Sequence, residues 1–211
     1  MKIKLSKNHV IESILLVLAF VGIVIVMVKA KWMDGLDGDV APQTYAIYTM
    51  VGKVLHNGEL PLWNSYIWSG LSDIGSPITE AFYPINWVLC YVFYDSTTQI
   101  VSYSIITWNL IIHIFIYFIG VYFLLKKNGT KWYWAYMLSI LAICNFGFSS
   151  FFSWIVYFDG FCYFPLIILM TIKLIESSDK VKIYKNIVAL GILFGLEASV
   201  SVSLMLVITA L

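Results

Sequence analysis

Residues 100–125 read IVSYSIITWNLIIHIFIYFIGVYFLL, and this stretch decides the class of fold. It is longer than the roughly 20 mostly apolar residues that a helix needs to cross a bilayer. Four further stretches have the same apolar character, at residues 10–28, 132–152, 157–175 and 187–211. The sequence therefore predicts an all-α polytopic membrane protein, with transmembrane helices at these five positions in a single transmembrane domain.

The composition of the whole chain supports a membrane environment. Of its 211 residues, 61% are hydrophobic and 12% are charged, and the mean hydropathy is +0.87. Soluble domains are about 45–50% apolar and about 25% charged. These values favour a lipid bilayer as the surroundings, and they exclude a disordered chain, a nucleic-acid-binding protein and a disulfide scaffold.

The distribution of lysine predicts the orientation of the helices. Residues 82–94 contain a short apolar run, which fits a re-entrant or interfacial helix better than a crossing. If this run does not cross, ten of the 13 lysines lie on one side, and only Lys29, Lys31 and Lys53 lie on the other. The positive-inside rule then places the N-terminus in the cytoplasm and residues 30–99 outside. We expect a multi-pass protein of the cytoplasmic membrane.

The external loop carries an acidic cluster at the outer end of the first helix. Asp34, Asp37 and Asp39 fall within six residues, with glycines between them. Asp37 and Asp39 can bind one divalent metal ion, such as Mg²⁺ or Mn²⁺, through their oxygens. Asp39 is also a good N-cap for the amphipathic helix predicted over residues 40–56. Both roles stay open, and this helix is expected to lie on the membrane surface.

Several short motifs follow one another in an order that resembles a known family. They are Asp39-x-x-x-Gln43-x-Tyr45, then Gly58-Glu59-Leu60-Pro61-Leu62-Trp63-Asn64, Ser69-Gly70, Ser76-Pro77 and Tyr83-Pro84-Ile85-Asn86, and later Tyr157-Phe158-Asp159-Gly160 leading into Pro165-Leu166. With the spanning helix before them, they resemble the bacterial YfhO-type membrane proteins of the GT-C glycosyltransferase superfamily. The resemblance covers most of the chain, although no single motif is strict.

The resemblance implies a GT-C-like helix bundle whose long first external loop carries juxtamembrane helices. It implies a glycosyltransferase that moves a sugar from a polyprenyl-phosphate carrier to a cell-wall or other extracellular acceptor. GT-C enzymes place a catalytic or metal-binding acid just after the first helix, which maps to Asp39 with Asp37 beside it. Many members continue beyond this region, and the chain is still apolar at Leu211. We therefore expect an N-terminal fragment of a longer protein.

Physical chemistry gives these residues plausible roles in sugar transfer. Asp39 can act as the general base that takes the proton of the acceptor hydroxyl while the lipid phosphate leaves. Gln43, Tyr45, Trp63 and Asn64 are the expected substrate-binding residues of the same loop. Aromatic side chains near the interface act either as membrane anchors or as surfaces on which a sugar ring stacks.

Polar residues near or inside the predicted spans supply the remaining candidates. Glu197 lies within the last span, where a carboxylate is unfavourable and usually faces a partner or a cavity. We expect Glu197, and Asp159 in a short external turn, to contact the substrate. Asn109 and His113 lie one helical turn apart, which favours a polar contact between helices over a metal site. Two alternatives remain: a lipid or solute transporter or flippase that uses Glu197, and a non-catalytic membrane scaffold.

Overall fold

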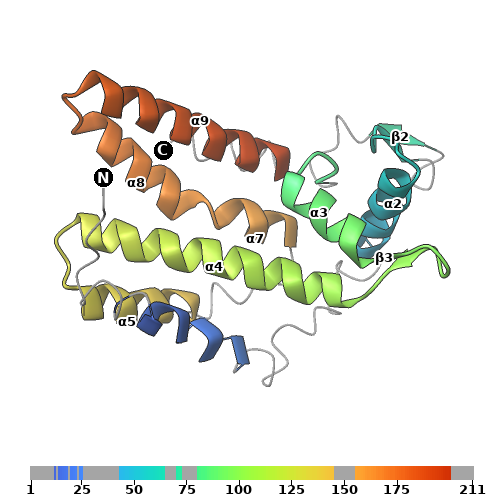
Figure 1. Cartoon of the computed structure of the whole chain (residues 1–211), viewed down its shortest axis with the longest axis horizontal. Helices are drawn as coiled ribbons and strands as arrows, with labels where there is room; N and C mark the ends of the chain where they lie inside the picture. The colour runs from blue at the N-terminus through green and yellow to red at the C-terminus, as the bar shows by residue number, and fades with distance from the viewer. Residues whose placement is uncertain are drawn as a thin grey trace, which may run out of the picture.

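The computed structural model describes residues 12, 14–18, 20–22, 24–25, 43–64, 70–72, 80–144 and 155–200. Most of these residues are helical, as Figure 1 shows. The helices are α2 (Tyr45–His56), α3 (Pro84–Phe93), α4 (Ser104–Lys127), α5 (Trp132–Ile143), α7 (Ile155–Phe161), α8 (Phe164–Ile175) and α9 (Lys180–Val200). Two antiparallel pairs of very short strands join them, β1 (Trp63–Asn64) with β2 (Leu71–Ser72), and β3 (Tyr94–Asp95) with β4 (Ile100–Val101).

Helix α4 lies at the centre of the arrangement. It packs against α5 on one side and against α7 and α8 on the other, and α9 packs on α7 and α8 (Figure 1). Helices α2 and α3 pack together at the end where α4 begins. The turns from α4 to α5 and from α8 to α9 lie at the opposite end. The molecule therefore has two distinct ends, joined by the long helices.

Three helical stretches are long and apolar enough to cross a membrane: α4, the consecutive helices α7 and α8, and α9. Side chains on the outer side of α4 agree with a lipid environment, because Trp108, Phe115 and Phe123 are 40–49% exposed. Facing inward, the same helix buries apolar side chains completely, namely Ile105, Ile106, Leu110, Ile114 and Phe118. The chain is accordingly a helical membrane protein.

The predicted segments fall on these helices as follows. The spans expected at 100–125 and 157–175 overlap α4 and the pair α7 and α8, and the one expected from 187 overlaps the end of α9. The span expected at 132–152 begins with α5, but residues 145–154 lie outside the described residues. Of the span at 10–28, the described residues are helical. The expected surface helix and re-entrant segment correspond to α2 and α3, and α3 is too short to count as a membrane-spanning helix.

Local sequence signals set several helix ends. After α2 and after α4, an Asn-Gly pair ends the helix, and Gly58 and Gly129 adopt φ of 75° and 82°. The amide of Glu59 then donates to the carbonyl of Val54, a pairing that satisfies orphan carbonyls at a helix C-terminus. Pro84 and Pro165 occupy the first turns of α3 and α8, where the missing amide hydrogen does no harm.

Two glycines, one within α2 and one within α4, allow neighbouring helices to pack closely. A Cβ added to Gly52 would lie 3.0 Å from the carbonyl oxygen of Cys90 in α3. One added to Gly120 would lie 3.1 Å from Cβ of Pro165 in α8. Small residues at such positions let the backbones approach, which is typical of helix contacts in membranes.

Candidate functional site

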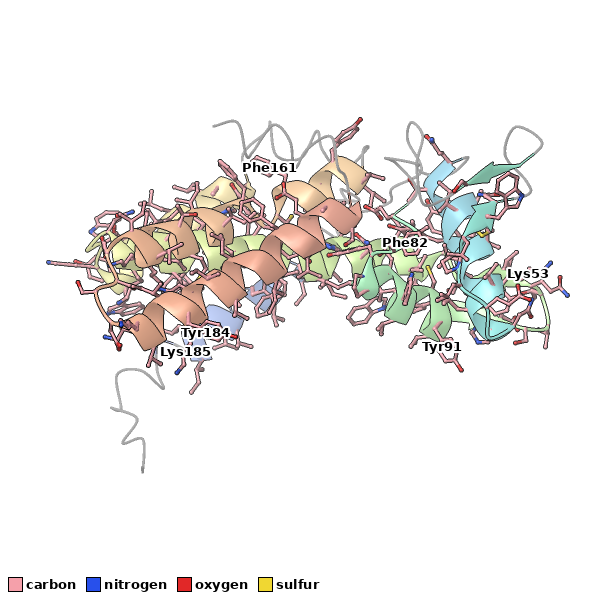
Figure 2. The ribbon with its side chains drawn as sticks, turned by 90° about the horizontal axis from the view of Figure 1, so that it is seen from above. Lys53, Phe82, Tyr91, Phe161, Tyr184 and Lys185 are labelled. Carbon is pink, nitrogen blue, oxygen red and sulfur yellow. The ribbon has the colours of Figure 1, made fainter. Side chains whose placement is uncertain are left out.

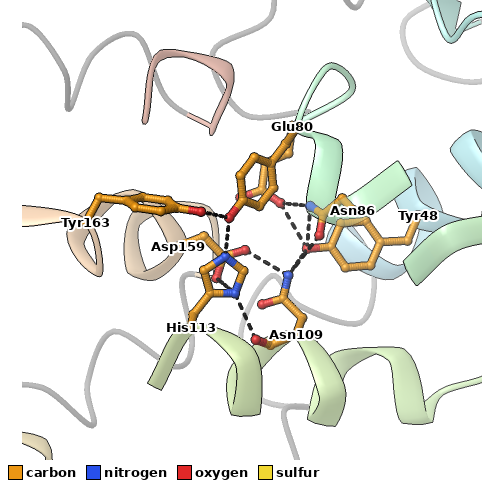
Figure 3. A network of polar contacts seen from close by, with 8 residues as sticks. Tyr48, Glu80, Asn86, Asn109, His113, Asp159 and Tyr163 are labelled. Atoms are coloured by element: carbon orange, nitrogen blue, oxygen red, sulfur yellow. Dashed lines mark hydrogen bonds and ion pairs between the residues drawn. The ribbon is translucent and has the colours of Figure 1, made fainter. Parts of the chain in front are cut away.

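A group of buried polar side chains lies where α2, α3, α4, α7 and α8 meet, near the end of the bundle at which α4 begins (Figure 3). We call it the polar network. Its members are Tyr48, Glu80, Tyr83, Asn86, Asn109, His113, Asp159 and Tyr163. All are at most 3% exposed, so their polar atoms must find partners within the protein.

Asn109 of α4 occupies the centre of the network. Its amide nitrogen donates to Oδ2 of Asp159 in α7 at 2.8 Å and to Oδ1 of Asn86 in α3 at 2.9 Å. The hydroxyl of Tyr48 in α2 lies 3.2 Å from the same nitrogen. One amide therefore connects four helices, which is the polar contact between helices that the sequence indicated for this residue.

Glu80 enters the network from the loop that precedes α3. Its backbone has φ of 47°, in the left-handed region that few non-glycine residues adopt. The Tyr48 hydroxyl donates to its Oε2 at 2.9 Å, and the amide of Asn86 donates to the same oxygen. Burial raises the pKa of Glu80 from its ordinary value of 4.5 to about 7, although these hydrogen bonds act in the opposite direction.

The surroundings of His113 fix which ring nitrogen carries the proton. Nδ1 lies 2.8 Å from the backbone carbonyl oxygen of Asn109, which can only accept, so Nδ1 is the donor. In the neutral ring Nε2 then accepts from the hydroxyl of Tyr83 at 2.5 Å. The Tyr83 oxygen in turn lies 2.5 Å from the hydroxyl of Tyr163. A chain of hydrogen bonds thus joins Tyr163, Tyr83 and His113, and Oδ1 of Asp159 lies 3.2 Å from Nδ1 without accepting a hydrogen bond from it.

Several acceptor oxygens of the network have no hydrogen bond. Within the described part of the chain, these are Oε1 of Glu80, Oδ1 of Asn109 and Oδ1 of Asp159. Burial raises the pKa of Tyr48 well above its ordinary value, so its hydroxyl stays a donor. The site therefore offers more acceptors than donors, and it can take up a proton or a ligand that donates hydrogen bonds.

Some of the acidic residues that the sequence suggested as site residues are described by the structure, and others are not. Asp37 and Asp39, the expected catalytic and metal-binding pair, lie outside the described residues, as does Asp34. Asp159 lies in the polar network and is fully buried. The sequence placed this residue in an external turn, whereas the structure has it in α7.

The other expected substrate-binding residues of the loop lie apart from the hydrogen bonds that the described residues of the network make with one another. Gln43 is half-buried, and the hydroxyl of Tyr45 donates to the carbonyl oxygen of Val101 at 2.6 Å, which ties α2 to β4. Trp63 is 57% exposed and lies over Gly70, where a Cβ would collide with its ring. Asn64, the next residue of β1, is buried.

Glu197 of α9 is buried, and neither of its carboxylate oxygens has a hydrogen-bond partner within the part of the chain that the structure describes. Its helix packs against α7 and α8, and Figure 1 shows the end of α9 beside α3. Neighbouring Val200 shares a core cluster with Tyr83 and Tyr163 of the network. Glu197 is therefore near the network end of the bundle without being joined to it.

Sequence reasoning missed Glu80, Tyr48, Tyr83 and Tyr163 as members of one site. Asn109 and His113 gave a signal, because polar residues one turn apart in an apolar helix need partners. The sequence gives no such signal for Glu80, since a glutamate in a polar loop is expected to be solvated. Its burial becomes visible only in the folded structure, where it lies against Tyr48 and Asn86.

Among the described residues, no three or more His, Cys, Asp or Glu side chains are arranged so that they could bind a metal ion. The Mg²⁺ or Mn²⁺ site expected at Asp37 and Asp39 lies outside those residues. No protein-family model, no curated protein and no solved structure matches the chain. The fold and the network thus define a helical membrane protein with a buried polar site near one end.

Proposed function

We propose that this protein is a GT-C-type membrane glycosyltransferase, related to the YfhO-type family, that moves a sugar from a polyprenyl-phosphate carrier to a cell-wall or other extracellular acceptor. The observation that supports it most is the convergence of polar side chains from α2, α3, α4 and α7 near one end of the bundle. The described helices that follow the predicted acids in the sequence, α2 and α3, lie at this end (Figure 1).

The chemistry of the proposed transfer needs a base at the depth of the lipid headgroups. In the transfer, the acceptor oxygen bonds to the sugar carbon, the bond from that carbon to the phosphate oxygen breaks, and polyprenyl phosphate leaves. Asp39, with Asp37 beside it, takes the proton of the acceptor hydroxyl in this proposal. The exposed ring of Trp63 offers an apolar face for a sugar, and its neighbour Asn64 is held in the same hairpin.

The distribution of charge supports an extracellular position of the network end. Figure 2 shows Lys185 at one end of the molecule and Lys53 at the other. The turns from α4 to α5 and from α8 to α9 lie at the same end as Lys185, and the lysines at these turns are Lys126, Lys127, Lys131, Lys180 and Lys182. By the positive-inside rule this end faces the cytoplasm, in the cell membrane.

The test uses membranes that contain the full-length protein, incubated with a radiolabelled polyprenyl-phosphate sugar. Asp39→Asn keeps the size and capping ability of the side chain but removes its basicity. We expect it to insert at the normal level and to transfer sugar at least about a hundredfold more slowly. Asp34→Asn is the matched control, with a much smaller loss. Unchanged transfer in Asp39→Asn would leave Asp37 as the candidate base, and no transfer by the wild type would contradict the proposed function.

A transporter or flippase is the second candidate, because neither carboxylate oxygen of Glu197 has a hydrogen bond within the described part of the chain, in a helix long and apolar enough to cross a membrane. A carboxylate in such a position often marks a path for ions or substrate. In the glycosyltransferase, Glu197→Gln keeps a polar contact and reduces transfer less than Asp39→Asn does. In a transporter, the same substitution abolishes movement of the substrate across proteoliposome membranes. Comparing the two variants in both assays decides between the candidates.

A further inference from the structure

Two carboxyl groups are buried side by side in the polar network. Glu80, from the loop before α3, is 3% exposed, and Asp159, from α7, is fully buried. Two amides connect the groups, because Asn86 donates to Glu80 and Asn109 donates to both Asn86 and Asp159. Figure 3 shows both among the same set of amide and phenol groups. Two like charges this close, away from water, cannot both ionise freely.

Only one oxygen of each carboxyl group accepts a hydrogen bond from the other residues of the network. Oε2 of Glu80 accepts from Tyr48 and Asn86, and Oδ2 of Asp159 accepts from Asn109. The other oxygens, Oε1 and Oδ1, lack a hydrogen bond within the described part of the chain. A buried acceptor oxygen without a hydrogen bond is unfavourable, so a further donor is expected at each of these two oxygens.

A nearby cation does not supply this donor. Among the residues that the structure describes, no lysine forms an ion pair with Glu80 or Asp159, and the chain contains no arginine. The described lysine ion pairs involve Lys126 and Lys127 at the far end of α4. His113 approaches Oδ1 of Asp159 at 3.2 Å, but its Nδ1 proton already points to the Asn109 carbonyl oxygen at 2.8 Å.

We propose that Glu80 and Asp159 share a proton at neutral pH and form a proton-binding site that fastens the loop before α3 to α4 and α7. The proton turns one carboxyl group into the donor that the other lacks. The titratable groups that face the pair are Tyr48 from α2, Tyr83 and Cys90 from the start and middle of α3, His113 from α4, and Cys162 and Tyr163 between α7 and α8. None of them is a permanent cation, so they leave the proton on the carboxyl pair.

The consequence is a defined dependence of stability on pH. The pKa of Glu80 is raised from 4.5 to about 7 by burial, so the folded protein holds this proton where the unfolded chain has lost it. Stability therefore falls as pH rises between these two values and stays low above them. This inference does not depend on whether the chain transfers a sugar.

The experiment measures the thermal unfolding of the purified full-length protein in detergent from about pH 5 to about pH 8. We expect the wild-type Tm to fall by roughly 5 °C over this range. Glu80→Gln carries its own permanent donor, so its Tm should change little with pH and should equal or exceed that of the wild type at the alkaline end. Glu59→Gln, an exposed glutamate from the end of α2, is the matched control and should follow the wild type.

A second measurement keeps the proposal testable if Glu80→Gln does not fold. The infrared carbonyl band of a protonated carboxyl group should be present at neutral pH and should shift in frequency in Asp159→Asn, because that substitution removes the carboxylate that accepts the shared proton. It is recorded in a Glu197→Gln background, because Glu197 is another buried carboxyl group. Two results would overturn the proposal. One is an equal loss of Tm in Glu80→Gln at acid and alkaline pH, and the other is a stabilisation of the wild type by sodium, relative to choline, that replaces the dependence on pH.

Discussion

The two ends of the helix bundle handle charge in opposite ways. At the lysine end, Lys126 lies 3.9 Å from Glu12 and Lys127 pairs with Glu176, and all four side chains keep contact with the surface. At the network end, Glu80 and Asp159 are buried, and they accept hydrogen bonds from amide and phenol groups instead of pairing with lysines. The first end uses full charges in polar surroundings, whereas the second uses neutral groups and hydrogen bonds.

This difference teaches which end depends on the precise tertiary structure. Exposed ion pairs gain little over separately hydrated charges, so the lysine end tolerates change. A buried polar group cannot form a hydrogen bond to water when its partner is removed, so the loss of one partner leaves the other without a hydrogen bond. The network end should therefore be sensitive to single substitutions in a way that the lysine end is not.

The largest expected effect concerns the side of the membrane on which each end lies. In a background with all three cysteines replaced by alanine, Lys53→Cys should react with a membrane-impermeant maleimide in intact cells. Lys127→Cys should react only after the membrane is permeabilised, because the positive-inside rule places the lysine end in the cytoplasm. Both residues lie in described helices, at opposite ends of the molecule. Labelling of position 127 from outside would contradict this topology and would require α3 to cross.

The next effect compares one asparagine from each end. Asn109→Leu removes the amide that connects Asp159 and Asn86, and we expect it to lower the free energy of unfolding by about 2–5 kcal/mol. Asn186, near the start of α9, makes a single half-buried hydrogen bond to the hydroxyl of Ser177 at 3.0 Å. Asn186→Leu should lower it by less than about 1.5 kcal/mol. Reversible unfolding in detergent measures the free energy of both variants. Equal decreases would show that the network end is no more sensitive to substitution than the lysine end.

The smallest effect is expected at the exposed ion pair of the lysine end. Lys127→Ala should change the free energy of unfolding by about 1 kcal/mol or less, because both side chains stay partly exposed. Adding salt should reduce even this difference, since salt screens exposed charges. A double-mutant cycle with Glu176→Ala isolates the pair. A coupling energy as large as the loss in Asn109→Leu would show that the two ends do not differ as described.

Much of the architecture could be predicted from the sequence. Helical spans appear because every backbone group in a bilayer must bond within the protein, so long apolar stretches become helices. The end of α2 was visible in the pair Asn57-Gly58, since glycine accepts the left-handed conformation that such an end requires. Asn109 and His113 were also visible, because polar groups in an apolar helix seek partners on other helices.

The composition of the site was decided only by the tertiary structure. Glu80 and Tyr83 lie beside the start of α3, whereas His113 and Asp159 lie far along the chain in α4 and α7, and only the fold brings them together. The hydrophobicity of an apolar stretch and the charge of a lysine do not depend on neighbours in the folded structure. The sequence alone therefore determined that this is a helical membrane protein, and it predicted which end faces the cytoplasm. A buried carboxyl group acquires its properties from neighbours that are remote in sequence, so only the folded structure could distinguish Glu80 from an ordinary surface glutamate.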